Sequence, residues 1–298
     1  MADPTSQPVQ HVYDDADLIT QEVLERYGQT PDPRLREIML SLIGHLHGFA
    51  RDVKLTADEW LFAMNFLQET GKWCGPGRNE FIIFSDALGL SMLTVTQAYQ
   101  RPEGATEPTL RGPFLIENAP AFAVGSDIGA GAQGTPMFAQ GRVLDAQGRP
   151  LAGAKVDVWH SDDRGLYDVQ DGLETRGPWA RAQITAGADG RYAFWSVLPV
   201  DYPVPQDGTA VLMLRATTGR TWRPAHLHFR IQAPGQQELI THIFDRRSKH
   251  LDGDAVFGVR PSLVADFEHR QAGTAAPDGK SMERDYYTLD YDFVMAAA

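Results

Sequence analysis

The sequence has almost no cysteine: Cys74 is the only one in 298 residues. A single cysteine excludes an intramolecular disulfide and is typical of proteins from a reducing compartment. It also excludes a cluster of thiolate ligands, so a metal ion in this protein must be held by nitrogen and oxygen atoms.

Long apolar segments and excess positive charge are missing as well. No apolar stretch approaches the roughly 20 residues of a membrane span, and the polar N-terminus, Met-Ala-Asp-Pro-Thr-Ser-Gln-Pro, does not look like a signal peptide. We therefore expect a cytoplasmic protein without a membrane partner. A net charge of −12 argues against a nucleic acid partner, although a local basic pocket could still hold a small anion.

The sequence does have an ordinary globular composition, with 43% hydrophobic and 22% charged residues. After a loose tail, apolar residues at helical spacing predict a helical N-terminal domain with its linker over residues 1–108. The expected helices cover 15–27, 33–53, a segment that starts at the capping box Thr56-Ala-Asp-Glu59, and 79–100. The apolar run from Phe81 to Val95 predicts a homodimer interface.

Near Arg101 the sequence changes to proline, glycine and short β-type runs. Strand signals then follow one another at 138–144, 154–159, 190–195, 210–216, 225–231 and 238–244. Regular short strands separated by turns predict a β-sandwich over residues 109–298. The expected fold class is therefore α+β, a helical dimerisation domain followed by a β-sandwich.

The stretch Arg223-Pro-Ala-His-Leu-His-Phe-Arg230 places two imidazoles and two guanidiniums close together. On a strand, side chains two positions apart point to the same face, so His226 and His228 can share one metal ion. Leu227 and Phe229 would then face the opposite, packed side. The stretch therefore predicts half of a metal site.

The same His-x-His spacing occurs at His45-Leu46-His47, inside a predicted helix. Residues two apart on a helix point about 200° from each other around the axis, so they cannot face one ion. We therefore interpret His45 and His47 as polar or partly buried side chains.

Two tyrosines in loops are candidates for the other half of the site. Tyr167 follows a predicted strand, and Tyr202 lies in the proline-rich loop Pro199-Val-Asp-Tyr-Pro-Val-Pro205. A loop stiffened by proline can position a ligand at a low entropic cost. From the residues alone, a loop tyrosine is more often a packing or hydrogen-bonding residue, and both interpretations stay open.

Four separated motifs together resemble the intradiol ring-cleavage dioxygenases. They are residues 141–160, Gly165-Leu-Tyr167, Tyr202-Pro-Val-Pro205 and Arg223-Pro-Ala-His-Leu-His-Phe229. The resemblance covers nearly the whole chain. Four further segments, 80–92, 111–114, 240–244 and 251–258, resemble the hydroxyquinol-cleaving members of the family more than the catechol-cleaving ones.

This resemblance implies one non-haem Fe(III) ion per subunit, held in the β-sandwich by Tyr167, Tyr202, His226 and His228. Phenolate oxygens are hard anionic donors, which suit ferric iron. The resemblance also implies two catalytic residues: Tyr202 leaves the iron and accepts a substrate proton, and Arg223 stabilises negative charge on the ring. The expected reaction is cleavage of hydroxyquinol (benzene-1,2,4-triol) by O2 to 3-hydroxy-cis,cis-muconate or maleylacetate, in the degradation of aromatic compounds.

Alignment of the motifs implies a substrate pocket lined by Ile83, Asp86, Leu110, Arg111, Gly112, Val204, Pro205, Arg223 and His242. Asp86 or Arg111 could pair with the third hydroxyl of hydroxyquinol, which would discriminate against an analogue that lacks it. His242 stands where the catechol enzymes carry glutamine. Cleavage of catechol or chlorocatechol stays an alternative. The family also implies a homodimer through the N-terminal helices, which can enclose a lipid.

Two other classes of protein share part of these features. Residues 141–159 alone also resemble prealbumin-like binding modules without enzymatic activity, but Tyr167, Tyr202 and the His-Leu-His strand favour the dioxygenase. A zinc or copper enzyme using the same histidines is less favoured, because two tyrosinates compete poorly with cysteine or histidine at zinc.

Overall fold

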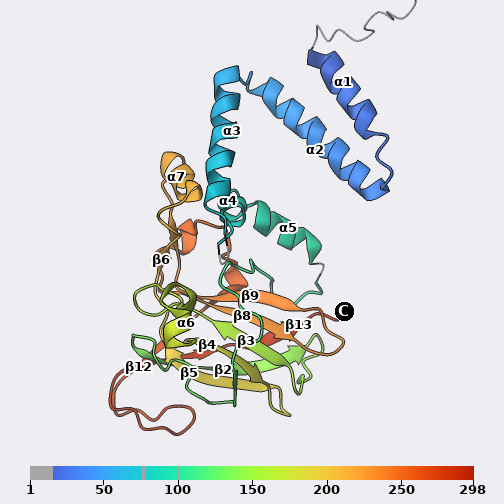
Figure 1. Cartoon of the computed structure of the whole chain (residues 1–298). Coiled ribbons are helices and arrows are strands. Elements are labelled where there is room, and N and C mark those ends of the chain that lie inside the picture. The colour runs from blue at the N-terminus through green and yellow to red at the C-terminus, as the bar shows by residue number, and fades with distance from the viewer. Residues whose placement is uncertain (1–15, 76–77, 100) are drawn as a thin grey trace, which may run out of the picture. The chain divides into compact units, whose positions relative to one another are not determined.

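The computed structural model describes residues 16–75, 78–99 and 101–298, so the expected loose tail lies outside the described residues (Figure 1). The chain divides into two compact units, the first ending at Gln68 and the second spanning Glu69–Ala298. The domain boundary expected between residues 108 and 109 stays a prediction.

The first unit contains helices α1 (Ala16–Tyr27) and α2 (Pro33–Asp52), and most of α3 (Ala57–Lys72). Asp32 caps α2 through a 2.7 Å hydrogen bond that its Oδ1 accepts from the Leu35 amide. At the start of α3, the Glu59 carboxylate accepts from the Thr56 amide and the Thr56 hydroxyl accepts from the Glu59 amide. The three predicted helices and the capping box are confirmed.

The second unit begins with a correction, because the single helix predicted over 79–100 is two helices, α4 (Glu80–Ala87) and α5 (Leu90–Ala98). Gly89 has a φ of 73°, a left-handed conformation that glycine adopts without strain and that ends the first helix. The two helices are bent by 81°.

In the described part of the chain, no single helix is long and apolar enough to cross a membrane. The bent pair α4 and α5 passes that test of length and composition only when the two helices are taken together. The expected cytoplasmic location and the absence of a membrane partner stay predictions.

Two β-sheets follow in the second unit (Figure 1). The first has the order β1-β4-β3-β8-β9-β10, with bounds Ala121–Phe122, Arg181–Thr185, Lys155–Trp159, His226–Gln232, Leu239–Asp245 and Val264–Ala265. The second contains β2 (Pro136–Asp145), β5 (Arg191–Val197), β11 (Glu268–Arg270), β12 (Tyr286–Asp290) and β13 (Phe293–Met295). A short ladder joins β6 (Tyr202–Pro203) to β7 (Trp222–Arg223).

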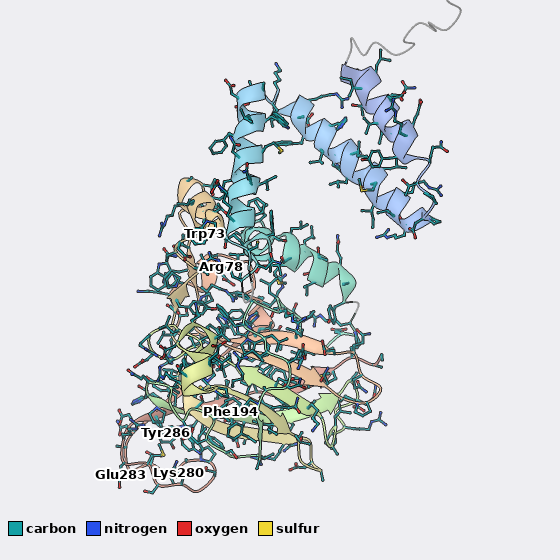
Figure 2. All side chains as sticks on the ribbon, in the orientation of Figure 1. Trp73, Arg78, Phe194, Lys280, Glu283 and Tyr286 are labelled. Carbon is teal, nitrogen blue, oxygen red and sulfur yellow. The ribbon has the colours of Figure 1, made fainter. Side chains whose placement is uncertain are left out.

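The hydrophobic core lies between the two sheets and contains buried side chains from both. Val156 and Val158 of β3 and Leu227 and Phe229 of β8 are fully buried in it, and Phe194 of β5, labelled in Figure 2, belongs to the same core. Because side chains alternate along a strand, the residues between these point to the other face of the first sheet. The predicted sandwich is confirmed. The face of the first sheet that points away from the core can carry polar side chains.

The strand predicted over 210–216 is wrong, because these residues form helix α7 (Thr209–Ala216). Val211 and Leu214 are buried whereas Leu212 is 57% exposed, which is helical spacing. The Glu80 carboxylate accepts a 2.9 Å hydrogen bond from the Ala210 amide, at the helix end where negative charge is stabilising. A short apolar run does not distinguish strand from helix by periodicity alone.

Four short helical turns complete the second unit. They are η1 (Asp168–Gln170), α6 (Leu173–Arg176), η2 (Leu251–Gly253) and η3 (Pro261–Leu263). η1 follows directly after Tyr167, and η2 lies next to β7. Two of these turns, η1 and η2, therefore lie beside segments that carry candidate site residues.

Candidate metal centre

The outer face of the first sheet carries a row of polar and aromatic side chains. Arg181 of β4 is paired in register with Trp159 of β3, Trp159 with His228 of β8, and His228 with His242 of β9. His226 lies two residues before His228 and so on the same face. The prediction that a strand presents both histidines to one side is confirmed.

Four side-chain donor atoms converge above this face. The Tyr167 hydroxyl lies 3.0 Å from His228 Nε2, 3.1 Å from the Tyr202 hydroxyl and 3.4 Å from His226 Nε2. His226 Nε2 also lies 3.1 Å from His228 Nε2 and 3.4 Å from the Tyr202 hydroxyl. Donors that share one ion at about 2.0–2.2 Å stand roughly 3 Å from one another. The four atoms are therefore spaced as the ligands of a single metal ion.

A hydrogen bond fixes the tautomer of His226. Its Nδ1 lies 2.6 Å from the Pro224 carbonyl oxygen, which can only accept, so Nδ1 carries the proton and Nε2 presents a lone pair. Burial, reinforced by the positive charge of Arg223, lowers the pKa of His226 well below its ordinary value. His226 is therefore a neutral imidazole at neutral pH, the form that binds metals.

On the Nδ1 side of its ring, His228 is held by packing and not by a hydrogen bond. Its Nδ1 has no hydrogen-bond partner among the residues that the structure describes. Trp159 stacks on the ring at a centroid distance of 4.8 Å, and a Cβ at Gly112 would lie only 3.0 Å from His228 Cε1. The φ of Gly112 is 68°, so the close approach and the left-handed backbone both require glycine.

Both tyrosines are buried: Tyr167 is 1% and Tyr202 is 8% exposed. Burial raises the pKa of each phenol, although the charge of Arg223 acts in the opposite direction. Phe114 packs on Tyr167 with ring centroids 4.5 Å apart, and Tyr202 pairs with Arg223 in the β6–β7 ladder. A phenolate in this place requires a cation beside it.

Arg223 is a buried, oriented cation next to the four donors. Asp254 accepts from its Nε at 3.1 Å and from one terminal nitrogen at 3.4 Å, while the other lies 3.3 Å from His226 Nε2. Burial alone would lower the pKa of Arg223, but Asp254 and the tyrosines raise it above its ordinary value. The guanidinium therefore stays charged.

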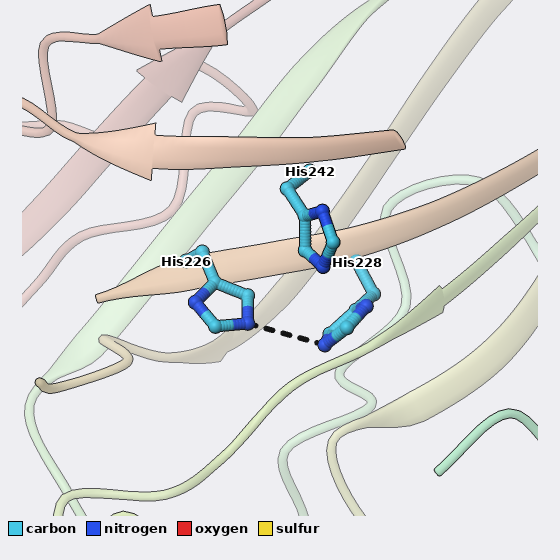
Figure 3. Close-up of side chains that lie close together, drawn as sticks. All are labelled: His226, His228 and His242. Atoms are coloured by element: carbon cyan, nitrogen blue, oxygen red, sulfur yellow. Dashed lines mark hydrogen bonds between the residues drawn. The ribbon is translucent and has the colours of Figure 1, made fainter. Parts of the chain in front are cut away.

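A third imidazole, His242, lies beside the two predicted ligands (Figure 3). Each of the three histidines offers a ring nitrogen within 4.8 Å of the others, and the rings of His228 and His242 are 4.1 Å apart. His242 Nδ1 is hydrogen-bonded to the Thr109 hydroxyl, and Nε2 has no partner within the described residues. His242 is therefore a buried polar side chain with one ring nitrogen still available.

The other predicted pocket residues are buried or half-buried, except Arg111. Asp86, like Ile83, is buried on α4, and burial raises the pKa of Asp86 while Ser91 and Arg223 oppose that shift. Leu110 and Val204 share one apolar cluster, and Pro205 is half-buried. Arg111 is not brought to the donors, since its exposed guanidinium pairs with Glu117 at 2.9 Å. The substrate roles of these residues stay predictions.

Sequence reasoning missed three supporting residues: Trp159, Thr109 and Asp254. Trp159 and Asp254 lie inside motifs that carry the family resemblance, but their contacts with His228 and Arg223 depend on strand pairing and on a distant loop. Trp159 is placed beside His228 by the register between β3 and β8, which no sequence signal gives.

Comparison with known proteins agrees with this geometry. The family model described as "Dioxygenase" matches residues 110–297, and "Catechol dioxygenase N terminus" matches residues 32–106. The chain belongs to the intradiol ring-cleavage dioxygenase family. The predicted fold class and family are thereby confirmed.

Within this family the chain is most like the hydroxyquinol 1,2-dioxygenases. It is 48% identical to 6-chlorohydroxyquinol 1,2-dioxygenase of Cupriavidus pinatubonensis over 95% of this chain and 98% of that one. It is 42% identical to hydroxyquinol 1,2-dioxygenase of Nocardioides simplex, over 94% and 95% of the two chains. The crystal structure of hydroxyquinol 1,2-dioxygenase from Pseudomonas putida DLL-E4 superposes with a TM-score of 0.88 at 42% identity, covering 95% and 99%.

Proposed function

We propose that this protein cleaves hydroxyquinol with O2 between its two adjacent hydroxyl-bearing carbons, giving 3-hydroxy-cis,cis-muconate or its tautomer maleylacetate. The observation that carries the proposal is the convergence of two phenol oxygens and two imidazole nitrogens. Tyr167 Oη and His226 Nε2 each lie within 3.4 Å of the other three atoms. The likeness to hydroxyquinol 1,2-dioxygenases supports the choice of substrate.

Ferric iron is the metal that fits these residues best. Tyr167, Tyr202, His226 and His228 would hold one Fe(III) ion per subunit. Two phenolates offset the charge of a trivalent ion, and the neutral imidazoles add no positive charge. A ferric ion held there would act as a Lewis acid for the diol and would make its ring reactive towards O2.

Tyr202 is suited to accept a substrate proton at its hydroxyl oxygen. Because burial raises the pKa of Tyr202 in spite of the nearby charge of Arg223, a Tyr202 phenolate that no metal ion holds takes up a proton at neutral pH. The residue lies on a two-residue ladder, which leaves it fewer backbone constraints than a long strand would. We therefore assign general base catalysis to Tyr202.

Arg223 supplies fixed positive charge where the ring becomes negative. Its guanidinium is held by Asp254 and lies beside His226 Nε2, so it is already oriented before the reaction. Preorganised charge of this kind in a buried site is worth a few kcal/mol of transition-state stabilisation, of the order seen for oxyanion holes.

Discrimination between the triol and catechol falls to the buried polar groups around the site. The carboxylate of Asp86 and Nε2 of His242 are the candidates to pair with the third hydroxyl. Catechol lacks that hydroxyl and would leave such groups unpaired, which disfavours its binding. Catechol or chlorocatechol cleavage is the alternative, and a chlorinated triol is a further candidate because of the 48% identical relative.

Oxygen uptake by the iron-loaded protein tests the proposal. Hydroxyquinol, 6-chlorohydroxyquinol, catechol, chlorocatechol and protocatechuate are compared at equal concentration, with product identified by mass spectrometry. We expect the triols to give the highest kcat/KM. A higher kcat/KM for catechol would show that catechol, and not hydroxyquinol, is the preferred substrate. No oxygen uptake with any of these compounds would refute the proposed function.

We also propose that the protein forms a homodimer through its N-terminal helices. The family resemblance further leads us to expect that this dimer binds a lipid. The supporting observation is a set of large apolar side chains exposed in the first unit: Leu35, Ile38, Leu42, Leu46, Phe49 and Phe62. Apolar surface of this extent is typical of an interface. Sedimentation equilibrium should give twice the mass of the chain, and mass spectrometry of an organic extract tests for lipid. A monomer would refute the dimer.

A further inference from the structure

We propose that the buried ion pair between Asp168 and Arg181 positions Tyr167. The pair fixes Tyr167 to the first sheet, so that this tyrosine is the ligand that stays on the metal. This inference rests on the proposed function, because it assigns Tyr167 to the iron. It adds two residues that neither the motifs nor the relatives' names point to.

The pair has the geometry of a rigid clamp. Arg181 donates from Nε to Asp168 Oδ2 at 2.8 Å and from a terminal nitrogen to Asp168 Oδ1 at 2.6 Å. Both side chains are 2% exposed. Two parallel hydrogen bonds between a guanidinium and a carboxylate fix orientation as well as distance. Solvent does not compete for either partner.

Asp168 lies at the tyrosine end of this clamp. It is the residue after Tyr167 and begins η1, and its carboxylate also accepts a 2.9 Å bond from the Val169 amide. The Tyr167 amide in turn donates to the Gln170 side chain at 3.1 Å. A shift of Asp168 therefore moves the backbone from which the Tyr167 phenol projects.

Arg181 lies at the sheet end. It is the first residue of β4 and is paired in register with Trp159, which is itself paired in register with His228 and stacks on its imidazole. The ion pair thus connects the loop of Tyr167 to the neighbouring strands β4, β3 and β8, the last of which carries His228. Consistent with this link, the 3.0 Å separation of the Tyr167 hydroxyl and His228 Nε2 is the shortest among the four donors.

Tyr202 has a different anchor. It lies on the two-residue strand β6, opposite Arg223, and is 8% exposed where Tyr167 is 1% exposed. The tyrosine expected to leave the metal is thus held by a short ladder, and the tyrosine expected to remain is held by a buried bidentate ion pair. This difference assigns separate roles to two ligands of the same chemical type.

The test compares Arg181→Lys with wild type in iron content, charge-transfer absorption maximum, kcat and KM. Lysine keeps the positive charge but cannot form the two parallel bonds. We expect iron to be retained, the absorption maximum to shift, and kcat to fall by about 10-fold to 100-fold, the range for residues that orient metal ligands. KM should stay within about 2-fold, because no substrate contact is removed.

Arg230→Lys is the matched control. Arg230 is also buried on the same sheet face, at 6% exposed against 2% for Arg181, and is paired with Asp157 and Glu117, neither of which adjoins a tyrosine ligand. This variant should keep the wild-type absorption maximum. An equal shift in Arg230→Lys, or no shift and no loss of kcat in Arg181→Lys, would overturn the proposal.

Asp168→Glu provides a second test if Arg181→Lys does not fold. It keeps both charges but lengthens the clamp by one methylene, so the absorption maximum should again move, and an unchanged maximum would contradict the proposal. If wild-type protein itself takes up no iron and shows no charge-transfer band, the proposed function fails rather than the role of this pair.

Discussion

The sequence His-Leu-His occurs twice in this chain, on α2 as residues 45–47 and on β8 as residues 226–228. On β8 the two Nε2 atoms are 3.1 Å apart and both imidazoles are 1% exposed. On α2, His45 is exposed, and His47 is half-buried with a 2.8 Å hydrogen bond to the Thr20 hydroxyl. The prediction that His45 and His47 are polar or partly buried side chains is confirmed.

The tripeptide His-Leu-His alone therefore does not define a pair of metal ligands. A strand repeats every two residues and turns both imidazoles to one face, whereas a helix separates them by about 200°. The strand also brings neighbours from adjacent strands, and these complete the surroundings of His228: Trp159 on one side and His242 on the other. A single helix has no such row of partners.

Replacing the histidines of the two His-Leu-His motifs should have the largest and most different effects. His226→Ala or His228→Ala removes a ligand, so we expect iron content near zero and at least about 100-fold lower activity, beyond what loss of an orienting residue causes. Metal analysis and oxygen uptake measure both. His45→Ala is the control from the other motif and should retain iron and activity. Equal iron loss in both would refute the distinction.

Tyr202→Phe should have the next largest effect. The substitution removes one donor and the proposed base but keeps the ring, so the fold should remain and turnover should fall by about 100-fold to 10,000-fold. Circular dichroism checks the fold, and oxygen uptake measures the rate of turnover. Full activity in this variant would remove Tyr202 from the site.

Gly112→Ala should disturb the ring of His228 while the His-Leu-His motif itself stays unchanged. The added Cβ would lie 3.0 Å from the His228 ring, and the left-handed backbone adds strain of about 1–3 kcal/mol. Gly148→Ala is the matched control, since Gly148 has a φ of 76° and nothing within 4 Å of an added Cβ. Both should lower the melting temperature, but only Gly112→Ala should weaken iron binding. Equal iron affinities would contradict the contact.

The smallest expected effect on the metal site comes from His160, a buried histidine outside the ligand set that should instead govern part of the pH dependence of stability. Burial lowers the pKa of His160 from 6.5 to about 4. The unfolded chain therefore binds a proton near pH 6.5 and the folded chain only near pH 4, so stability falls as pH drops through this window. The loss is about 3 kcal/mol.

His160→Gln tests this dependence. Urea unfolding of iron-free protein between pH 7.5 and 5 should show a shallower loss of stability in the variant than in wild type. Slopes that do not differ would show that His160 does not titrate between the two states.

Sequence reasoning reached the fold class and the histidine pair because both follow from local periodicity. It failed at 79–100, where one glycine bends the chain, and at 210–216, where a short apolar run suits either a strand or a helix. The buried contacts of Trp159, Thr109 and Asp254 depend on strand register and long-range packing, which the sequence does not state. The tyrosines came from family resemblance, because a loop phenol alone has no diagnostic spacing.

The most direct test of the metal site is the visible absorption spectrum of the purified, iron-loaded protein. Two phenolates on ferric iron should give a red protein with a charge-transfer band and one iron per subunit, and Tyr202→Phe should shift or weaken that band. A well-folded protein that stays colourless and takes up no iron would contradict the assignment of His226, His228, Tyr167 and Tyr202 to a ferric centre.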